Sequence, residues 1–320
     1  TPTLAIVVER EEKILAFVPR DYWEVRATFG CAAGEYDGRW FDPDFRKPED
    51  DEHARAERIW DRTKAEAIVE TCRGKPGTVV EEAKPSTQAP PLLFDLTSLQ
   101  REGNSRFGFS AKTTLSIAQA LYEKHKVLTY PRTDSRALPE DYVAVAKKTV
   151  DALAANKGYA PFAKQIAKGG WVKPNKRIFD NAKISDHFAI IPTLESPRSL
   201  SEAEQKIYDL VVKRFLAIFF PAAEYLITTR ITTVEAHQFK TEGKVLVEPG
   251  WLAVYGREAM QEQGALVKVE ADERVAARAI EAAGLQTRPP ARYTEATLLT
   301  AMEGAGKLID DDDLRLAMAG

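Results

Sequence analysis

The order of strand-like and helical patterns along the chain constrains its fold more than any other feature. Residues 22–29 combine aromatic and β-branched residues in the manner of a β-strand, and residues 78–83, TVVEEA, should form a second strand. Beyond the proline-containing segment 84–91 the apolar residues recur with helical spacing, and they do so until Pro221. Strand-like patterns then return. We therefore expect an α+β protein in which a helical domain is inserted into a β-rich domain built from both flanks.

The expected domain boundaries follow these changes of pattern. Residues 1–95 and 222–288 are assigned to the β-rich domain, residues 96–221 to the helical domain, and residues 289–320 to the start of a further helical domain. Segment 84–91 is interpreted as the linker at the first boundary because it is rich in proline. Several domains agree with a length of 320 residues, which exceeds what a single small core needs.

Individual elements are predicted from periodicity, proline positions and capping signals. The expected helices cover residues 3–17, 54–72, 95–104, 110–126, 139–156, 201–220 and part of 288–306. The expected strands cover residues 22–29, 78–83, 224–236, 244–248, 251–256 and 265–271. Ser110 is a predicted helix N-cap, and Ser201 with Glu204 matches a capping box.

Charge is distributed unevenly along the chain. The formal net charge is −3, which argues against a uniformly basic nucleic-acid binder. Residues 96–136, however, carry seven Lys or Arg against three Asp or Glu, and residues 164–177 carry five basic residues and no acidic one. Such local basic surfaces suit a groove for a polyanion. We expect no membrane span, because no apolar run approaches roughly 18 residues.

Cysteine use and the first residues indicate the setting of the chain. Cys31 and Cys72 provide neither a metal-binding pair nor a disulfide framework, which favours a reducing compartment such as the cytoplasm. The chain opens with Thr1-Pro2-Thr3 and lacks a signal pattern. We therefore interpret it as a piece of a longer protein.

The segment LTYPRTDSR, residues 128–136, holds the most distinctive candidate for catalysis. A phenol is a weak nucleophile at neutral pH unless its surroundings help it. Tyr130 suits attack on a phosphodiester, because the phosphotyrosine diester that it makes conserves the energy of the broken bond. Arg132 would supply a bidentate donor to the phosphate, and Pro131 would restrain the backbone between the two side chains. A helix-entry turn with a solvated arginine is the alternative interpretation of this triplet taken alone.

Residues 90–142 resemble, over their whole length, the active-tyrosine region of type IA DNA topoisomerases, most closely the bacterial topoisomerase III branch. Three further segments match in the family's order, namely TPTLAIVVEREEKILAFVP at 1–19, ISDHFAIIPT at 184–193 and PPARYTEATLLTAMEGAGKLIDD at 289–311. The resemblance implies ATP-independent cleavage of one DNA strand through a 5′-phosphotyrosine link, followed by strand passage and religation. It also implies that the β-rich domain is the arch of a toroidal enzyme and that the inserted domain is winged-helix, or catabolite-activator-like.

The resemblance implies roles for individual residues. Tyr130 matches the nucleophile, Arg132 the arginine that positions the scissile phosphate, and His187 a histidine that assists the chemistry or its coupling to DNA binding. The family commonly has two adjacent histidines here, whereas this chain has Phe188 in the second place, so a structural role for His187 stays open. The residues expected to contact DNA are Lys112, Thr133, Ser135, Arg136, Ser185, Asp186 and Arg292.

The resemblance also implies a requirement for Mg²⁺, held by an N-terminal fold that should precede Thr1. We therefore expect no metal site in this chain, and we expect the chain alone to be inactive. Asp42-Pro43-Asp44 and the acidic run 310–313 are interpreted as a loop and a solvated helix start. The expected partner is single-stranded DNA. We expect a monomer without membrane attachment, located in the cytoplasm with the nucleoid.

Other interpretations stay open on the sequence. A non-catalytic module would bind single-stranded DNA without chemistry, and a tyrosine recombinase or type IB enzyme would form a 3′-phosphate link. For Arg292, a salt bridge to Glu295 is the alternative to a DNA contact. Trp23, Trp40 and Trp251 could stack on bases, but core packing is favoured for all three.

Overall fold

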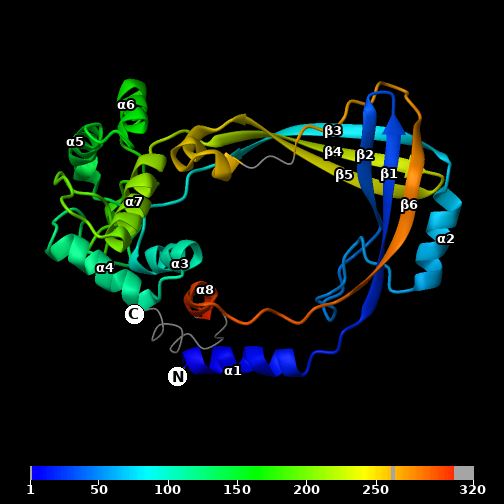
Figure 1. Ribbon diagram of the computed structural model, residues 1–320, viewed down its shortest axis with the longest axis horizontal. Coiled ribbons are helices and arrows are strands. Elements are labelled where there is room, and N and C mark those ends of the chain that lie inside the picture. The colour runs from blue at the N-terminus through cyan, green and yellow to red at the C-terminus, as the bar shows by residue number, and fades with distance from the viewer. Residues whose placement is uncertain (1, 261–263, 306–320) are drawn as a thin grey trace.

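Six strands of the described chain close into an antiparallel barrel (Figure 1). The computed structural model describes residues 2–260 and 264–305, so the acidic run 310–313 lies outside the described residues. The barrel order is β1-β2-β5-β4-β3-β6. The strands are β1 (Asp21–Cys31), β2 (Gly34–Phe41), β3 (Pro76–Gln88), β4 (Ala223–Val234), β5 (His237–Glu248) and β6 (Val275–Gln286).

The helices lie mainly between β3 and β4 in the sequence. They are α1 (Pro2–Leu15), α2 (Arg62–Cys72), α3 (Leu96–Phe107), α4 (Ala111–Glu123), α5 (Val143–Leu153), α6 (Ala160–Gly169), α7 (Glu202–Ala217) and α8 (Glu295–Ala305). Figure 1 shows α3 to α7 gathered at one end of the molecule, with β3, β4 and β5 reaching towards them from the barrel. β6 leads back to α8, which packs beside α3 and α1.

Two separate cores stabilise these two regions. Inside the barrel, Phe29 and Phe239 are fully buried, with their ring centroids 5.3 Å apart. Gly38 lies beside them, and a Cβ atom there would come within 2.9 Å of the Phe29 ring. The second core lies among the helices, where Leu121 and Phe215 are fully buried. Burial of such apolar side chains is the main stabilising contribution in each region.

Predicted caps agree with the helix starts. The Ser110 side chain accepts a hydrogen bond from the Thr113 amide, and Ser201 with Glu204 forms a reciprocal capping box, so both predictions are confirmed. The helix predicted over 54–72 begins only at Arg62, because the Asp61 carboxylate caps it by accepting from Thr63 N. Helix α6 was not predicted.

Several strand predictions were wrong. Residues 84–88 continue β3 and pair with β4, so the proline-rich segment is largely strand. Pro85 is tolerated because β3 pairs with β6 only at Pro76 and Gly77, which leaves an edge where a missing N–H costs little. Residues 251–256 form mainly a 3₁₀ helix and 265–271 are irregular. β2 and β6 were missed.

Two of the tryptophans confirm the core-packing interpretation. Trp40 and Trp251 are both buried, and Trp251 donates from its indole nitrogen to the carbonyl oxygen of Gln88 at 2.8 Å. Trp23 is half-buried against the barrel core. Among the described residues, no helix combines the length and the apolar character needed to cross a membrane.

Replacing the barrel-core ring at position 239 is expected to destabilise the protein strongly. Phe239→Ala should lower the free energy of unfolding by roughly 3–5 kcal/mol, because it leaves a cavity beside Phe29. Val247→Ala, on the same strand but 57% exposed, serves as the control and should cost less than about 1 kcal/mol. Urea denaturation followed by circular dichroism measures both. Equal losses would contradict the assignment of the barrel core.

The two cysteines should differ sharply in reactivity. Cys72 is fully buried, and burial raises the pKa of its thiol to about 11, whereas Cys31 is partly exposed. Because the thiolate is the reactive form, a thiol reagent such as Ellman's should modify about one thiol per native chain at neutral pH. Cys31→Ser should abolish this native reaction and Cys72→Ser should preserve it. A native reaction that survives in Cys31→Ser would show that Cys72 is accessible.

Candidate active site

Tyr130 lies in an irregular segment that follows α4 and is held against a second irregular segment. Backbone hydrogen bonds connect the two: Thr129 N donates to Ile191 O at 3.0 Å, and Ala189 N donates to Ala137 O at 3.0 Å. Leu138 N donates to Ile178 O at 2.8 Å. The backbone around Tyr130 is therefore fixed by long-range pairing and not by a helix or a ladder of its own.

Burial alternates along this segment. Pro131, Thr133 and Ser135 are buried, whereas Arg132 and Asp134 are exposed. This is the alternation of an extended segment, in which residues two apart point to the same side. Tyr130, which is half-buried, thus shares the outward side with Arg132.

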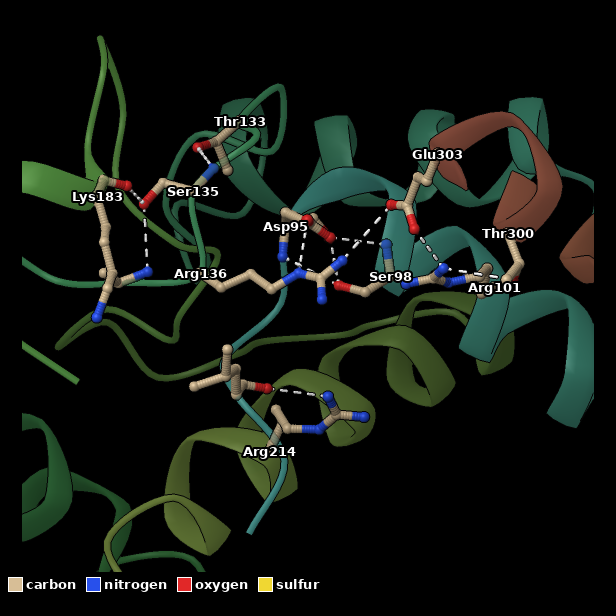
Figure 2. Close-up of polar contacts among 12 residues, drawn as sticks. Asp95, Ser98, Arg101, Thr133, Ser135, Arg136, Lys183, Arg214, Thr300 and Glu303 are labelled. Atoms are coloured by element: carbon tan, nitrogen blue, oxygen red, sulfur yellow. Dashed lines mark hydrogen bonds and ion pairs between the residues drawn. The ribbon is translucent and has the colours of Figure 1, made fainter. Parts of the chain in front are cut away.

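The buried hydroxyl groups of Thr133 and Ser135 join the two segments (Figure 2). Thr133 Oγ1 donates to the carbonyl oxygen of His187 at 2.9 Å, and Ser135 Oγ donates to that of Lys183 at 2.7 Å. The same oxygens accept from Ser135 N at 3.1 Å and from Ala137 N at 3.2 Å. In this structure both side chains hold the 183–187 loop in place, and their contact with DNA stays a prediction.

The Tyr130 ring lies between two other rings. Its centroid is 4.4 Å from that of His187, with the planes tilted by 48°, and 5.4 Å from that of Tyr122 in an edge-on arrangement. His187 is exposed, so its ring can reach both the phenol and solvent. The side chain in contact with the phenol ring is thus an imidazole, a group that can accept or donate a proton. The structure thus brings Tyr130 and His187 together, although they are far apart in sequence.

The remaining predicted residues fall into two groups. Arg132, Lys112 and Asp186 are exposed, and Ser185 Oγ donates to Asp134 Oδ1 at 3.1 Å on the surface. These groups are accessible to a ligand. The other two, Arg136 and Arg292, are engaged in ion pairs.

Arg292 pairs with Glu11 of α1, and the interpretation of a salt bridge to Glu295 was wrong. Its Nη2 and Nε lie 2.7 and 3.0 Å from the two carboxylate oxygens of Glu11. This hydrogen bonding lowers the pKa of the Glu11 carboxyl. Glu295 instead accepts from Ala111 N, at the start of α4, at 2.5 Å. A partner almost three hundred residues away could not be inferred from local spacing.

Arg136 is held by Asp95, a residue that the sequence analysis did not single out for the site. Arg136 Nε donates to Asp95 Oδ2 at 2.7 Å, and its Nη2 lies 3.5 Å from Glu303 Oε1 (Figure 2). Asp95 also caps α3 in a reciprocal capping box with Ser98. An aspartate directly before a predicted helix indicates an N-cap, so Asp95 could have been found from the sequence. No local pattern in the sequence indicates Tyr122 or Glu303.

No group of three or more His, Cys, Asp or Glu is arranged to hold a metal within residues 2–260 and 264–305. Asp42 Oδ1 accepts from Asp44 N at 3.0 Å, which is the hydrogen bond of a local turn.

Removing one buried hydroxyl should loosen the tyrosine segment locally. Ser135→Ala deletes the donor to Lys183 O and the acceptor of Ala137 N, so hydrogen exchange at the Ala137 amide should accelerate about tenfold, corresponding to about 1.4 kcal/mol. Mass spectrometry of peptides covering 131–140 and 181–190 measures this exchange. Ser116→Ala, at an exposed position of α4, should leave both peptides unchanged. Unchanged exchange in Ser135→Ala would contradict the role of this hydroxyl.

Comparison with known proteins places these features in a family. The family described as DNA topoisomerase matches residues 1–306. DNA topoisomerase 3 of Bacillus subtilis is 39% identical over 323 aligned residues, covering 98% of this chain and 42% of the relative. The protein of the same name from Bacillus cereus strain ATCC 14579 is 38% identical, covering 99% of this chain and 43% of the relative.

A solved structure supports the same fold. Full-length topoisomerase I from Thermotoga maritima aligns with a TM-score of 0.65 over 95% of this chain and 47% of that chain, at 24% sequence identity. The chain thus spans less than half the length of these relatives. The matched family covers both the barrel and the tyrosine segment. The chain belongs to the DNA topoisomerase family.

Proposed function

We propose that this chain is the strand-cleaving part of a type IA DNA topoisomerase of the topoisomerase III branch. The observation that carries the proposal is the placement of the Tyr130 ring 4.4 Å from the His187 ring, on the same outward side as Arg132. A phenol, an imidazole and a guanidinium together provide a nucleophile, a proton carrier and a phosphate ligand. Relatives named DNA topoisomerase 3 support the assignment.

The reaction is a reversible transesterification. Tyr130 Oη attacks the phosphorus of one strand, which forms a phosphotyrosine bond to the 5′ side and breaks the bond to the 3′ oxygen. The phenol loses its proton, and the departing 3′ oxygen gains one; His187, whose ring contacts the Tyr130 ring, would carry the proton in either direction. Arg132 stabilises the charge on the non-bridging oxygens. One phosphodiester replaces another, so religation by the 3′ hydroxyl requires no ATP.

The proposal includes a larger architecture. The helices between β3 and β4 form an inserted domain of the winged-helix type, and the barrel is the arch that moves the cut ends apart in a toroidal enzyme. The chain would be the central part of a longer, monomeric enzyme, in line with the greater length of its relatives. Mg²⁺ would be bound outside the described residues, so the chain alone would bind single-stranded DNA without relaxing plasmid. The bacterial relatives favour the cytoplasm, with the nucleoid, as its location.

Two tyrosines in ring contact give a matched test of the nucleophile. In the longer enzyme, Tyr130→Phe should abolish the denaturation-resistant adduct with a labelled single-stranded oligonucleotide, because phenylalanine has no attacking oxygen. Tyr122→Phe removes a neighbouring hydroxyl while it keeps the ring that packs against Tyr130, and it should retain the adduct. Gel electrophoresis under denaturing conditions measures both. An adduct that persists in Tyr130→Phe would exclude Tyr130 as nucleophile and favour a non-catalytic DNA-binding role for this segment.

A further inference from the structure

The carboxylate of Glu303 lies between two arginines from other parts of the chain (Figure 2). Arg101 of α3 places its Nη1 2.5 Å from Glu303 Oε2, and Arg136 of the tyrosine segment places its Nη2 3.5 Å from Glu303 Oε1. Glu303 belongs to the last turn of α8, the helix that packs on α3. One carboxylate thus bridges the tyrosine segment, α3 and α8.

We propose that Arg101 and Arg136 form a binding site for a backbone phosphate of single-stranded DNA, which Glu303 occupies while α8 is docked. The inference rests on the proposed function, because it takes DNA as the ligand of this chain. A guanidinium binds carboxylate and phosphate oxygens with the same planar fork of donors. The two carboxylate oxygens of Glu303 therefore mark where two phosphate oxygens would bind. When α8 moves away, the site becomes available to DNA.

The position of Arg136 is fixed independently of Glu303. Its Nε donates to Asp95 Oδ2, and Asp95 is buried and held by its capping box with Ser98. The bond from Nε to Asp95 thus fixes the orientation of the Arg136 guanidinium, and Nη2 is directed at Glu303. Such pre-organisation lowers the entropic cost of binding an anion at this position.

The site is open enough for a ligand to enter. The side chains of Arg101, Arg136 and Glu303 are 23%, 34% and 38% exposed. A cavity of about 310 Å³ adjoins them, and its wall includes both arginines and Arg214. Arg214 donates to Leu92 O and lies 3.2 Å from Glu102, so it contributes positive charge from a fixed position. Three arginines and one carboxylate, that of Glu102, line this cavity, so its wall carries an excess of positive charge.

Of the carboxylates near these arginines, Glu303 is the one that a phosphate group can replace. Three arginines face three carboxylates here, those of Asp95, Glu102 and Glu303. Asp95 is buried and Glu102 is anchored within α3, whereas Glu303 comes from another element. If α8 departs, the arginines outnumber the carboxylates, and the resulting positive charge attracts a polyanion.

The site is also connected to the reaction centre. Arg136 and Tyr130 share one irregular segment, and this segment is joined to the start of α3 by the hydrogen bond from Leu96 N to Thr133 O at 3.0 Å. The contacts of α8 with α3 include the hydrogen bond from Ala296 N to Asn104 Oδ1 at 3.1 Å. Such bonds can be replaced by water or phosphate oxygens when α8 separates.

Charge removal at position 303 tests the proposal directly. In this chain, Glu303→Gln should tighten binding of a fluorescein-labelled oligothymidylate by about tenfold at low salt, because it frees both arginines for one phosphate. It should also steepen the dependence of log affinity on log salt concentration by about 0.7, the value for one added phosphate contact on a single strand. Fluorescence anisotropy measures both quantities, without any cleavage step.

Two controls separate a site from a general charge effect. Glu66→Gln removes the same charge and frees Arg62 on α2, outside the proposed site, so its affinity should change little. Arg101→Gln combined with Glu303→Gln should lose most of the tenfold gain. The proposal is overturned if Glu66→Gln and Glu303→Gln tighten binding equally, or if the double variant keeps the gain. Because the assay needs no covalent step, failure here leaves the role of Tyr130 intact, and an adduct that persists in Tyr130→Phe leaves this site intact.

Discussion

Two buried hydroxyl groups, those of Thr133 and Ser135, hold together segments that have little regular structure of their own. Each hydroxyl donates a hydrogen bond to a carbonyl oxygen of the 183–187 loop. Each also accepts a hydrogen bond from a backbone N–H of its own segment. Unpaired polar groups in such a buried place would cost free energy, so the pairing selects one arrangement of the two segments. The contact between the Tyr130 and His187 rings follows from that arrangement.

The same arrangement explains why the face that carries Tyr130 and Arg132 is accessible. The buried side of the segment is anchored, so Tyr130 and Arg132 are directed towards the surface. The core among the helices packs against this segment, and the barrel has a second, separate core. The reversible cleavage that we propose would require both a fixed phenol that retains its partners and flanking bodies that can move apart. The ion pairs of α8 with Arg101 and Arg136 suit a contact that opens and closes.

Local signals in the sequence predicted local structure well. The caps at Ser110 and Ser201 were confirmed because a cap depends on residues three positions apart. β6 was missed because its alanines have little strand propensity, and it is a strand because it pairs with β1 along most of its length and with β3 at one end. Arg230 is buried beside Tyr36 and paired with Glu81, and no local pattern in the sequence indicates this placement. In the site, the motif indicated Tyr130 and Arg132, but the partners Glu11 and Glu303 depend on tertiary contacts that no local pattern records.

The most direct test of the central claim is to identify the atoms joined in the covalent intermediate. The adduct of the longer enzyme with a single-stranded oligonucleotide would be digested with protease and nuclease and analysed by tandem mass spectrometry. The account predicts a nucleotide mass on the peptide that contains Tyr130, linked through a 5′-phosphate, with a free 3′ hydroxyl on the released strand. A nucleotide on any other residue, or a 3′-phosphate link, would contradict it.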